Sequence, residues 1–312
     1  MRMRVLHVRL RAALGAFCIA SVAFSAPLAA QASEWDTEIW GGFEFQGETD
    51  LKEGPGEFDF WMLALGARAR RGLDERATLV LKGDYRAIGY DFDDMLIGEP
   101  WETVHVLRLQ PHLRVRLNDD WFLVGGPNFE LSGETSADAS DSARGGASFG
   151  VGYRHGENLE VVLGLIVQSE IEDDTYVAPL INVRWGIADG LRLSLASESS
   201  RGGELRLSYS FLDDFEVAIG GGFRRERFRL DDDRIAPAFL PPSRQKDGVG
   251  QEEATILSAR FAWAFTDHAR LETYLGTTID GEFRLEDKRG HKIADRDYDN
   301  ALFGGLRLRY SF

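Results

Sequence analysis

The sequence predicts an all-β fold, a transmembrane antiparallel up-and-down β-barrel of about 14 strands, preceded by a cleavable signal peptide. Three observations lead to this prediction. Apolar and polar residues alternate in segments of about ten residues along most of the chain, as barrel strands require. Short and longer connections alternate between these segments. The last segment ends on Phe312, with a large apolar residue at every second position before it.

Residues 1–32 have the features of a secretory signal peptide. A basic stretch without acids precedes an apolar run from Ala12 to Ser25, which is too short to span a bilayer comfortably. The segment Ala30-Gln31-Ala32 fits a cleavage site, so we expect residues 33–312 to form the barrel. The alternative is an uncleaved membrane anchor. The only cysteine, Cys18, lies in the apolar run, so the mature chain would have neither disulfides nor thiolate chemistry.

The chain is acidic, with a formal net charge of −15. Removal of a signal peptide with four arginines and no acid would take this charge to about −19. Nucleic-acid binding depends on a net basic surface, so we expect no nucleic-acid partner.

The first seven expected strands lie between residues 35 and 167. The fourth is the most regular, because Leu107 and Leu109 alternate with Arg108 and Gln110. Successive strand side chains point to opposite faces, so this segment has one apolar and one charged face. The fifth is weakly patterned. The seven apolar faces fall within residues 35–45, 61–69, 79–85, 107–117, 121–131, 149–153 and 159–167.

The other seven expected strands follow between residue 177 and the end of the chain. The ninth is weakly patterned, like the fifth, so twelve strands is the alternative count. A soluble β-sandwich or calycin-like barrel is the alternative fold, in which the apolar faces would point inward. The seven apolar faces fall within residues 177–185, 191–195, 205–211, 215–223, 257–265, 271–279 and 306–312.

The connections form two sets. In barrels of this kind the short turns are periplasmic and the longer loops lie outside the cell, so both ends of the mature chain would be periplasmic. Aromatic residues flank both sets of connections, as the two interfacial belts of a barrel require. The expected short turns are 71–75, 118–120, 155–158, 188–190, 212–214 and 266–268. The expected longer loops are 47–57, 91–100, 132–143, 170–174, 199–203, 231–252 and 281–297.

If the apolar face meets lipid, the opposite face lines a lumen that is rich in arginine. A ring of arginines in a wet lumen favours anions. The alternative is that these arginines pair with lumenal acids and partly plug the pore. The candidate lumen-facing residues are Arg68, Arg108, His112, Arg114, Arg116, Arg206, Arg260, Arg307 and Arg309.

The acidic clusters in the longer loops have no calcium-loop spacing, so we expect no metal site and no cofactor. The loop segment Pro237 to Pro242 is apolar for an outside loop and could fold into the mouth as a constriction, with a disordered tip as the equal alternative. His291, Asp295, Asp297 and the pair Asp93/Asp94 could meet at the outer rim as in an omptin-like protease, but rim acids are plentiful. No segment places a serine and a histidine together as a lipase requires, so we expect no enzymatic activity.

The closing strand resembles the last strand of bacterial outer-membrane β-barrels, which implies an assembly signal at Leu306, Leu308, Tyr310 and Phe312. From about Pro179 onward, the chain also resembles an uncharacterised (domain-of-unknown-function) family of outer-membrane β-barrel proteins. This second resemblance implies a fold and a location but no activity. The segments that carry it are 250–253, 262–265, 281–287, 297–299 and 310–312.

The sequence therefore predicts a bacterial outer-membrane barrel, exported through the periplasm. The most favoured role is a porin-like channel for small solutes, with anions preferred. The alternatives are a closed structural or surface-interaction barrel, with loops 231–252 and 281–297 as its contact surface, and, less favoured, a lipid or peptide hydrolase. The expected partners are outer-membrane lipid, lipopolysaccharide, the barrel-assembly machinery and small solutes.

Overall fold

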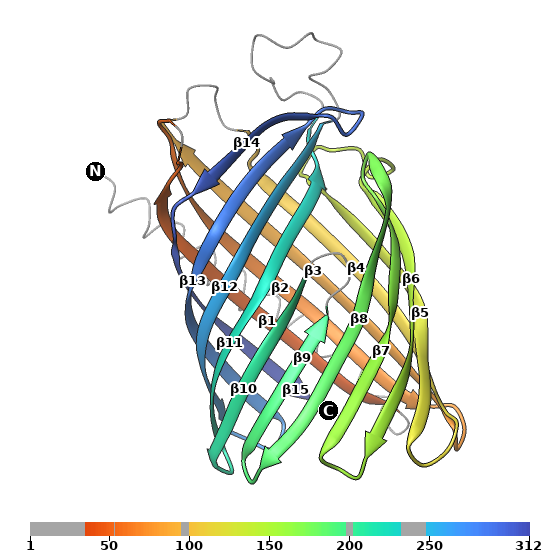
Figure 1. Cartoon of the computed structure of the whole chain (residues 1–312). Helices are drawn as coiled ribbons and strands as arrows, with labels where there is room; N and C mark the ends of the chain where they lie inside the picture. Colours follow the sequence, from red (N-terminus) through yellow and green to blue (C-terminus); the bar gives the residue numbers. More distant parts are fainter. Residues whose placement is uncertain (1–34, 53, 95–99, 198–201, 232–247) are drawn as a thin grey trace.

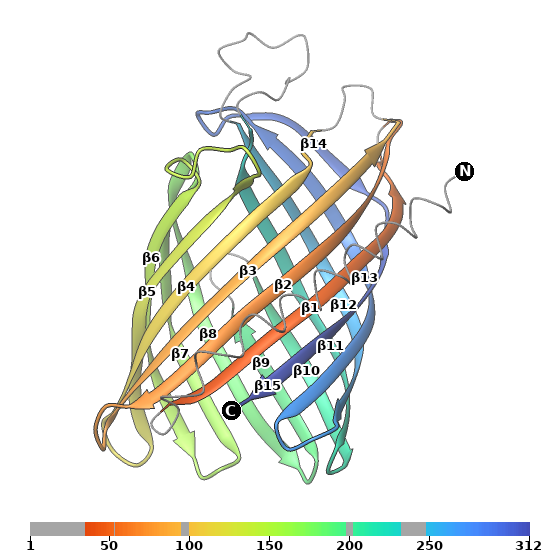
Figure 2. The same ribbon diagram turned by 180° about the vertical axis from the view of Figure 1, so that it is seen from behind.

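A closed barrel of antiparallel strands makes up the computed structural model, which describes residues 35–52, 54–94, 100–197, 202–231 and 248–312 (Figures 1 and 2). The predicted signal peptide, residues 1–32, and the segment Pro237–Pro242 lie outside the described residues. Among the described residues, no helix has the length and apolar character needed to cross a membrane.

Fifteen strands form one sheet, and all but β14 belong to the barrel wall. The barrel closes because β15 pairs with both β1 and β13, while β14 pairs only with β13. This confirms the predicted fourteen strands and excludes twelve. The strands are β1 (Asp36–Asp50), β2 (Glu57–Gly72), β3 (Ala77–Asp93), β4 (Thr103–Arg116), β5 (Trp121–Glu134), β6 (Ala143–His155), β7 (Leu159–Glu170), β8 (Asp173–Ala188), β9 (Leu191–Ser197), β10 (Gly202–Leu212), β11 (Phe215–Arg229), β12 (Val249–Ala264), β13 (Ala269–Glu286), β14 (Lys292–Tyr298) and β15 (Leu302–Ser311).

The six predicted short turns all lie at one end of the barrel, which we call the short-turn end and which is at the bottom of Figure 1. The opposite end is the long-loop end. In three of the short turns a side chain accepts backbone hydrogen bonds. Thr266 Oγ1 accepts them from the N–H of His268 and Ala269, at 3.2 and 2.9 Å. Asp74 Oδ1 accepts them from the N–H of Arg76 and Ala77, both at 2.7 Å. These bonds lower the pKa of the Asp74 carboxyl. Asn118 accepts equivalent bonds from Asp120 and Trp121.

Large apolar side chains cover the outward face of the wall. Leu163, Ile219 and Leu275 are 58%, 63% and 73% exposed. In the alternative soluble fold these residues would form a buried core, so their exposure excludes that alternative. A contiguous exposed apolar surface of this kind fits contact with lipid.

The long-loop end is closed by part of the barrel itself. Residues 226–229 of β11 and the following Leu230 are all buried, whereas residues 217–219 of the same strand alternate between exposed and buried. Both faces of this segment are therefore covered. Arg229 also pairs in parallel with Gly133 of β5, which is not a neighbour of β11 in the wall. We call residues 226–230, at the end of β11, and 248–254, at the start of β12, the inner hairpin; the two segments pair with each other.

The inner hairpin corrects two predictions. The link 231–252 was expected to be an outside loop, but β12 begins at Val249, and residues 249–252 are buried. The link 281–297 was also expected to be a loop, but β13 continues to Glu286 and β14 pairs with it. Both stretches are polar enough to suggest loops. Residues 249–252 form a strand whose charged side chain is buried and paired, whereas the second stretch carries accessible ion pairs, Arg284 with Glu282 and Lys292 with Asp295, along the β13–β14 ladder.

The wall is interrupted beside β9, which has only seven residues. Among the described residues, β8 pairs with β9 only from Asn182 onward, so residues 173–180 pair with β7 alone. Pro179 lies in this stretch, where its missing N–H costs no bond on the open side. Figure 1 shows β9 ending far below the long-loop end while β8 and β11 continue upward. Arginine side chains of β11 bridge the interval: Arg227 donates to the carbonyl of Ile171 at 2.8 Å.

Candidate functional site

Strand β4 shows most directly which residues line the lumen. Arg108 is 7% exposed, whereas its neighbours Leu107 and Leu109 are 42% and 52% exposed on the outward face. By this alternation His112, Arg114 and Arg116 follow Arg108 down the inner face toward the short-turn end. The same parity places Arg68 of β2, Arg206 of β10, Arg260 of β12, and Arg307 and Arg309 of β15 on the inner face.

An aromatic cluster fills the lumen at the long-loop end. Trp101 is 1% exposed and lies at its centre, with edge contacts to Tyr90, Phe92, Phe228 and Phe283 at centroid distances of 5.2–5.9 Å. Phe228 comes from the inner hairpin, and the other rings come from the wall and from the loop before β4. The cluster therefore packs the inner hairpin against β2, β3 and β4.

Below the aromatic cluster, a network of ion pairs and hydrogen bonds binds the same side of the inner hairpin. Arg224 donates to Glu44 at 3.0 Å and to Glu252 at 3.1 Å. Tyr90 and Tyr298 both donate to Glu252, at 2.7 and 3.0 Å. These groups are largely buried, so each carboxylate needs such partners to offset its lost hydration.

A second group of ion pairs binds the other side of the inner hairpin to β5, β6 and β7. Arg144 donates to Glu130 and, at 2.8 Å, to Glu170. It also donates to the backbone carbonyl of Arg227 at 3.1 Å. The Arg227 side chain donates in turn to Glu286 at 2.6 Å. The inner hairpin thus divides the long-loop half of the lumen, with the aromatic cluster and the Glu252 network on one side and the ion pairs of Arg144 and Arg227 on the other.

The short-turn half of the lumen is lined by more arginine. Arg260 donates to Glu272 at 3.0 Å and to Glu204 at 2.8 Å, and Arg206 shares both acids. Of the other predicted residues, Arg108 pairs with Asp84, Arg114 with Glu160 and Arg309 with Glu38. The predicted pairing with lumenal acids therefore holds for five candidates. Among the described residues, Arg68, Arg116 and Arg307 have no carboxylate within 4.0 Å.

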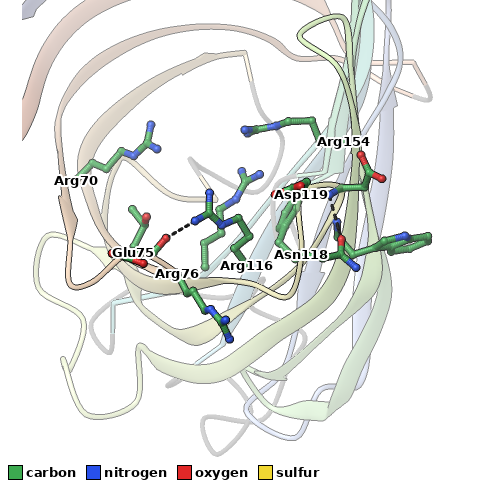
Figure 3. A pocket seen from close by; sticks show the side chains of 12 residues that line it. Arg70, Glu75, Arg76, Arg116, Asn118, Asp119 and Arg154 are labelled. Atoms are coloured by element: carbon green, nitrogen blue, oxygen red, sulfur yellow. Dashed lines mark hydrogen bonds between the residues drawn. The ribbon is translucent and has the colours of Figure 1, made fainter.

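A basic pocket lies at the short-turn end, beside the turn that joins β2 to β3 and the turn that joins β4 to β5 (Figure 3). We call it the arginine pocket. Figure 3 shows Arg70 and Arg154 extending toward each other, with Arg116 between them. Its floor is fixed, because the Arg114 guanidinium lies 3.5 Å from the centre of the Phe122 ring. The lining residues are Arg70, Glu75, Arg76, Thr78, Arg114, Arg116, Asn118, Asp119, Asp120, Trp121, Phe122 and Arg154.

A glycine makes room for this floor. Gly152 of β6 pairs with Phe122, and a Cβ at Gly152 would lie 2.0 Å from the Phe122 ring. We expect Gly152→Ala to displace the ring and lower the free energy of unfolding by about 1–3 kcal/mol, as overpacking does. Gly145→Ala on the same strand is the matched control, since no atom lies within 4 Å of its Cβ position. Urea midpoints of the two variants measure the difference, and equal midpoints would contradict this account.

Several important lumenal residues are absent from the sequence-based candidates. Continuing the alternation of β11 past Phe223 would have found Arg224 and Glu226. Glu44 could have been found in the same way on β1. Alternation could not have identified Arg227 as buried. It has the outward parity of Phe223 on β11, and only the inward course of the inner hairpin buries it.

The residues considered for a protease-like site do not meet. His291 lies in the turn before β14, where its Nδ1 is 3.5 Å from Asp287 Oδ1. Asp295 instead accepts a bond from Lys292 at 3.0 Å. Within the described part of the chain, no group of three histidines, cysteines or acids could hold a metal ion.

Comparison with solved structures agrees with the strand topology. A FadL homologue from Pseudomonas aeruginosa matches over 89% of this chain and 90% of its own, with a TM-score of 0.51 and 9% identity. The fold is that of an outer-membrane β-barrel. An outer membrane channel from Pseudomonas putida F1 matches over 89% of this chain and 95% of its own, with a TM-score of 0.47 and 15% identity. The P. putida toluene transporter TodX matches with a TM-score of 0.43 and 9% identity, over 89% and 90% of the two chains.

No protein-family model matches the sequence, and no curated protein does either. The resemblance of the last third of the chain to an uncharacterised barrel family therefore stays a prediction. At 9% identity the FadL homologue supports the barrel fold alone and leaves the solute open.

Proposed function

We propose that this chain is a channel of the bacterial outer membrane for small solutes, with anions preferred. The observation that carries the proposal is the arginine-lined lumen, whose short-turn half ends in a basic pocket. A barrel with a purely structural role would have no need of guanidinium groups without acid partners along its inner face. A wet lumen with such groups attracts anions and repels cations.

In this arrangement the short turns face the periplasm, the longer loops face outward, and the exposed apolar wall contacts outer-membrane lipid. The conformation described here is closed, because the aromatic cluster and the ion pairs around the inner hairpin fill the long-loop half. Conduction therefore requires the inner hairpin to leave its place. Residues 249–253 also pair with residues 282–286 of β13, so the inner hairpin would move together with that part of β13.

The buried contacts of the inner hairpin also favour a second candidate, a closed barrel with a structural or surface-interaction role. Ion pairs and ring contacts of this extent would hold such a barrel shut permanently. The two candidates differ in one measurable property, which is whether the lumen opens.

The test is single-channel recording with the folded, purified barrel in planar bilayers. We expect discrete openings, with a reversal potential in a salt gradient that shows anion preference. Cation preference would refute the anion part of the proposal. If neither the wild type nor a variant with a weakened inner hairpin conducts, the channel is refuted, and the second candidate, a closed barrel with a structural or surface-interaction role, is the one supported. Assays with lipid and peptide substrates should detect no hydrolysis.

A further inference from the structure

We propose that the arginine pocket is a binding site for a compact dianion, a phosphate group or a pair of carboxylates carried by a small solute. This inference deepens the proposed function, because it assigns a site to the anions that the lumen would attract. It stands on the positions of five arginines contributed by β2, β4, β6 and the turn before β3.

The charges of the pocket are only partly neutralised from within the protein. Arg114 and Arg154 share a single carboxylate, that of Glu160, at donor–acceptor distances of 2.5–3.1 Å. Within the described part of the chain, neither Arg70 nor Arg76 has a carboxylate within 4.0 Å. Arg116 donates to the Glu75 backbone carbonyl at 2.7 Å, which orients it without cancelling its charge.

Three carboxylates also line the pocket, and all three belong to the turns before β3 and β5. Glu75 follows Asp74 in the turn before β3, while Asp119 and Asp120 lie in the turn before β5. All three are exposed to solvent, where interactions between charges are weak. The guanidinium groups of Arg70, Arg116 and Arg154 converge on the space between them in Figure 3. That space is where an incoming anion would be held.

The geometry favours an oxyanion with more than one charged oxygen. Guanidinium groups present paired N–H donors that match the oxygens of phosphate and carboxylate, and bonds between two charged groups are the strong ones. A monovalent halide has a single charge on a single atom, so it offers no separate charged oxygens to different guanidinium groups. The fixed floor, with Arg114 held between Glu160 and Phe122, limits the reorganisation that binding requires.

The test uses isothermal titration of the full folded barrel in detergent with inorganic phosphate, succinate and chloride as probes. We expect saturable binding of phosphate or succinate at one site per chain, and no saturable binding of chloride at equal ionic strength. Arg70→Gln and Arg116→Gln should each weaken binding about tenfold, as the loss of a charge-assisted hydrogen bond does. Both side chains are exposed, so the variants should fold, which circular dichroism can check.

Arg192→Gln is the matched control. It removes the same charge from the same end of the barrel, on β9, but Arg192 does not line the pocket. Wild-type affinity in this variant supports a defined site. Equal weakening in all three variants, or the absence of saturable binding by either dianion, would overturn the inference. Binding without conduction would refute only the channel, and conduction without binding would refute only the site.

Discussion

The Glu226→Arg variant should conduct at voltages at which the wild-type barrel is closed. Glu226 is 2% exposed and receives two hydrogen bonds from Arg86, at 2.6 and 3.4 Å. An arginine at this position would face Arg86 across a buried contact between the inner hairpin and β3. Breaking a buried ion pair costs about 3–5 kcal/mol. A change of this size shifts the ratio of open to closed barrels at least about a hundredfold.

The double variant Arg86→Glu/Glu226→Arg is the control, since it restores an ion pair with the opposite orientation. It should close the channel again, and single-channel recording of the three proteins measures the effect. If the single variant is as silent as the wild type while still folded, this contact does not hold the channel closed. If the double variant conducts as well as the single one, the effect comes from lost packing rather than from charge.

Replacing Arg144 with methionine should destabilise the folded barrel by about 3–5 kcal/mol, because it leaves buried acids without their main cation. The Arg144 side chain is 1% exposed, and those of its partners Glu130 and Glu170 are 3% and 2% exposed. Its bond to the Arg227 carbonyl would also be lost, leaving a buried acceptor unpaired. Urea denaturation followed by tryptophan fluorescence gives the free energy of unfolding.

Arg284→Met provides the comparison for Arg144→Met. Arg284 pairs with Glu282 at 3.1 Å on an accessible part of β13, with side-chain exposures of 36% and 29%. Surface ion pairs contribute about 0–1 kcal/mol, so this variant should unfold close to the wild type. If the two variants lose equal stability, the burial of Arg144 does not have the energetic consequence that we assign to it.

The wall of the barrel could be predicted from the sequence because its pattern is local. Each strand shows its apolar face by alternation, as Leu107 and Leu109 do, and each short turn shows its polar residues. Even the weakly patterned ninth strand was located, although it has only seven residues. The same alternation identified which arginines have inward parity, but it carried no information about their partners. Arg260 of β12 meets Glu204 of β10 across the intervening strand β11, and alternation along one strand does not identify such a partner.

The inner hairpin was missed because its cause is not local. The polar residues 250–253 resemble an exposed loop, and only contacts from other strands show that Gln251 and Glu252 are buried. The pairing of Arg229 with Gly133 joins segments that are almost a hundred residues apart in the chain, and no periodicity records it. The arginine pocket was missed in part for a similar reason, since Arg76 lies in a turn and Arg154 at the end of a strand.

The short strand β9 has a consequence for the lipid around the protein. Seven residues rise about 23 Å along a strand, and a tilt of about 40° reduces the height to about 18 Å. The apolar band of an outer-membrane barrel is about 25 Å tall, so in the proposed outer-membrane location β9 would cover only part of that height. Lipids beside it would thin or tilt to meet it, at a modest cost for each ångström of mismatch. In that location the barrel would deform one side of its surrounding bilayer, and this asymmetry would orient the protein relative to neighbours that share the thinned lipid.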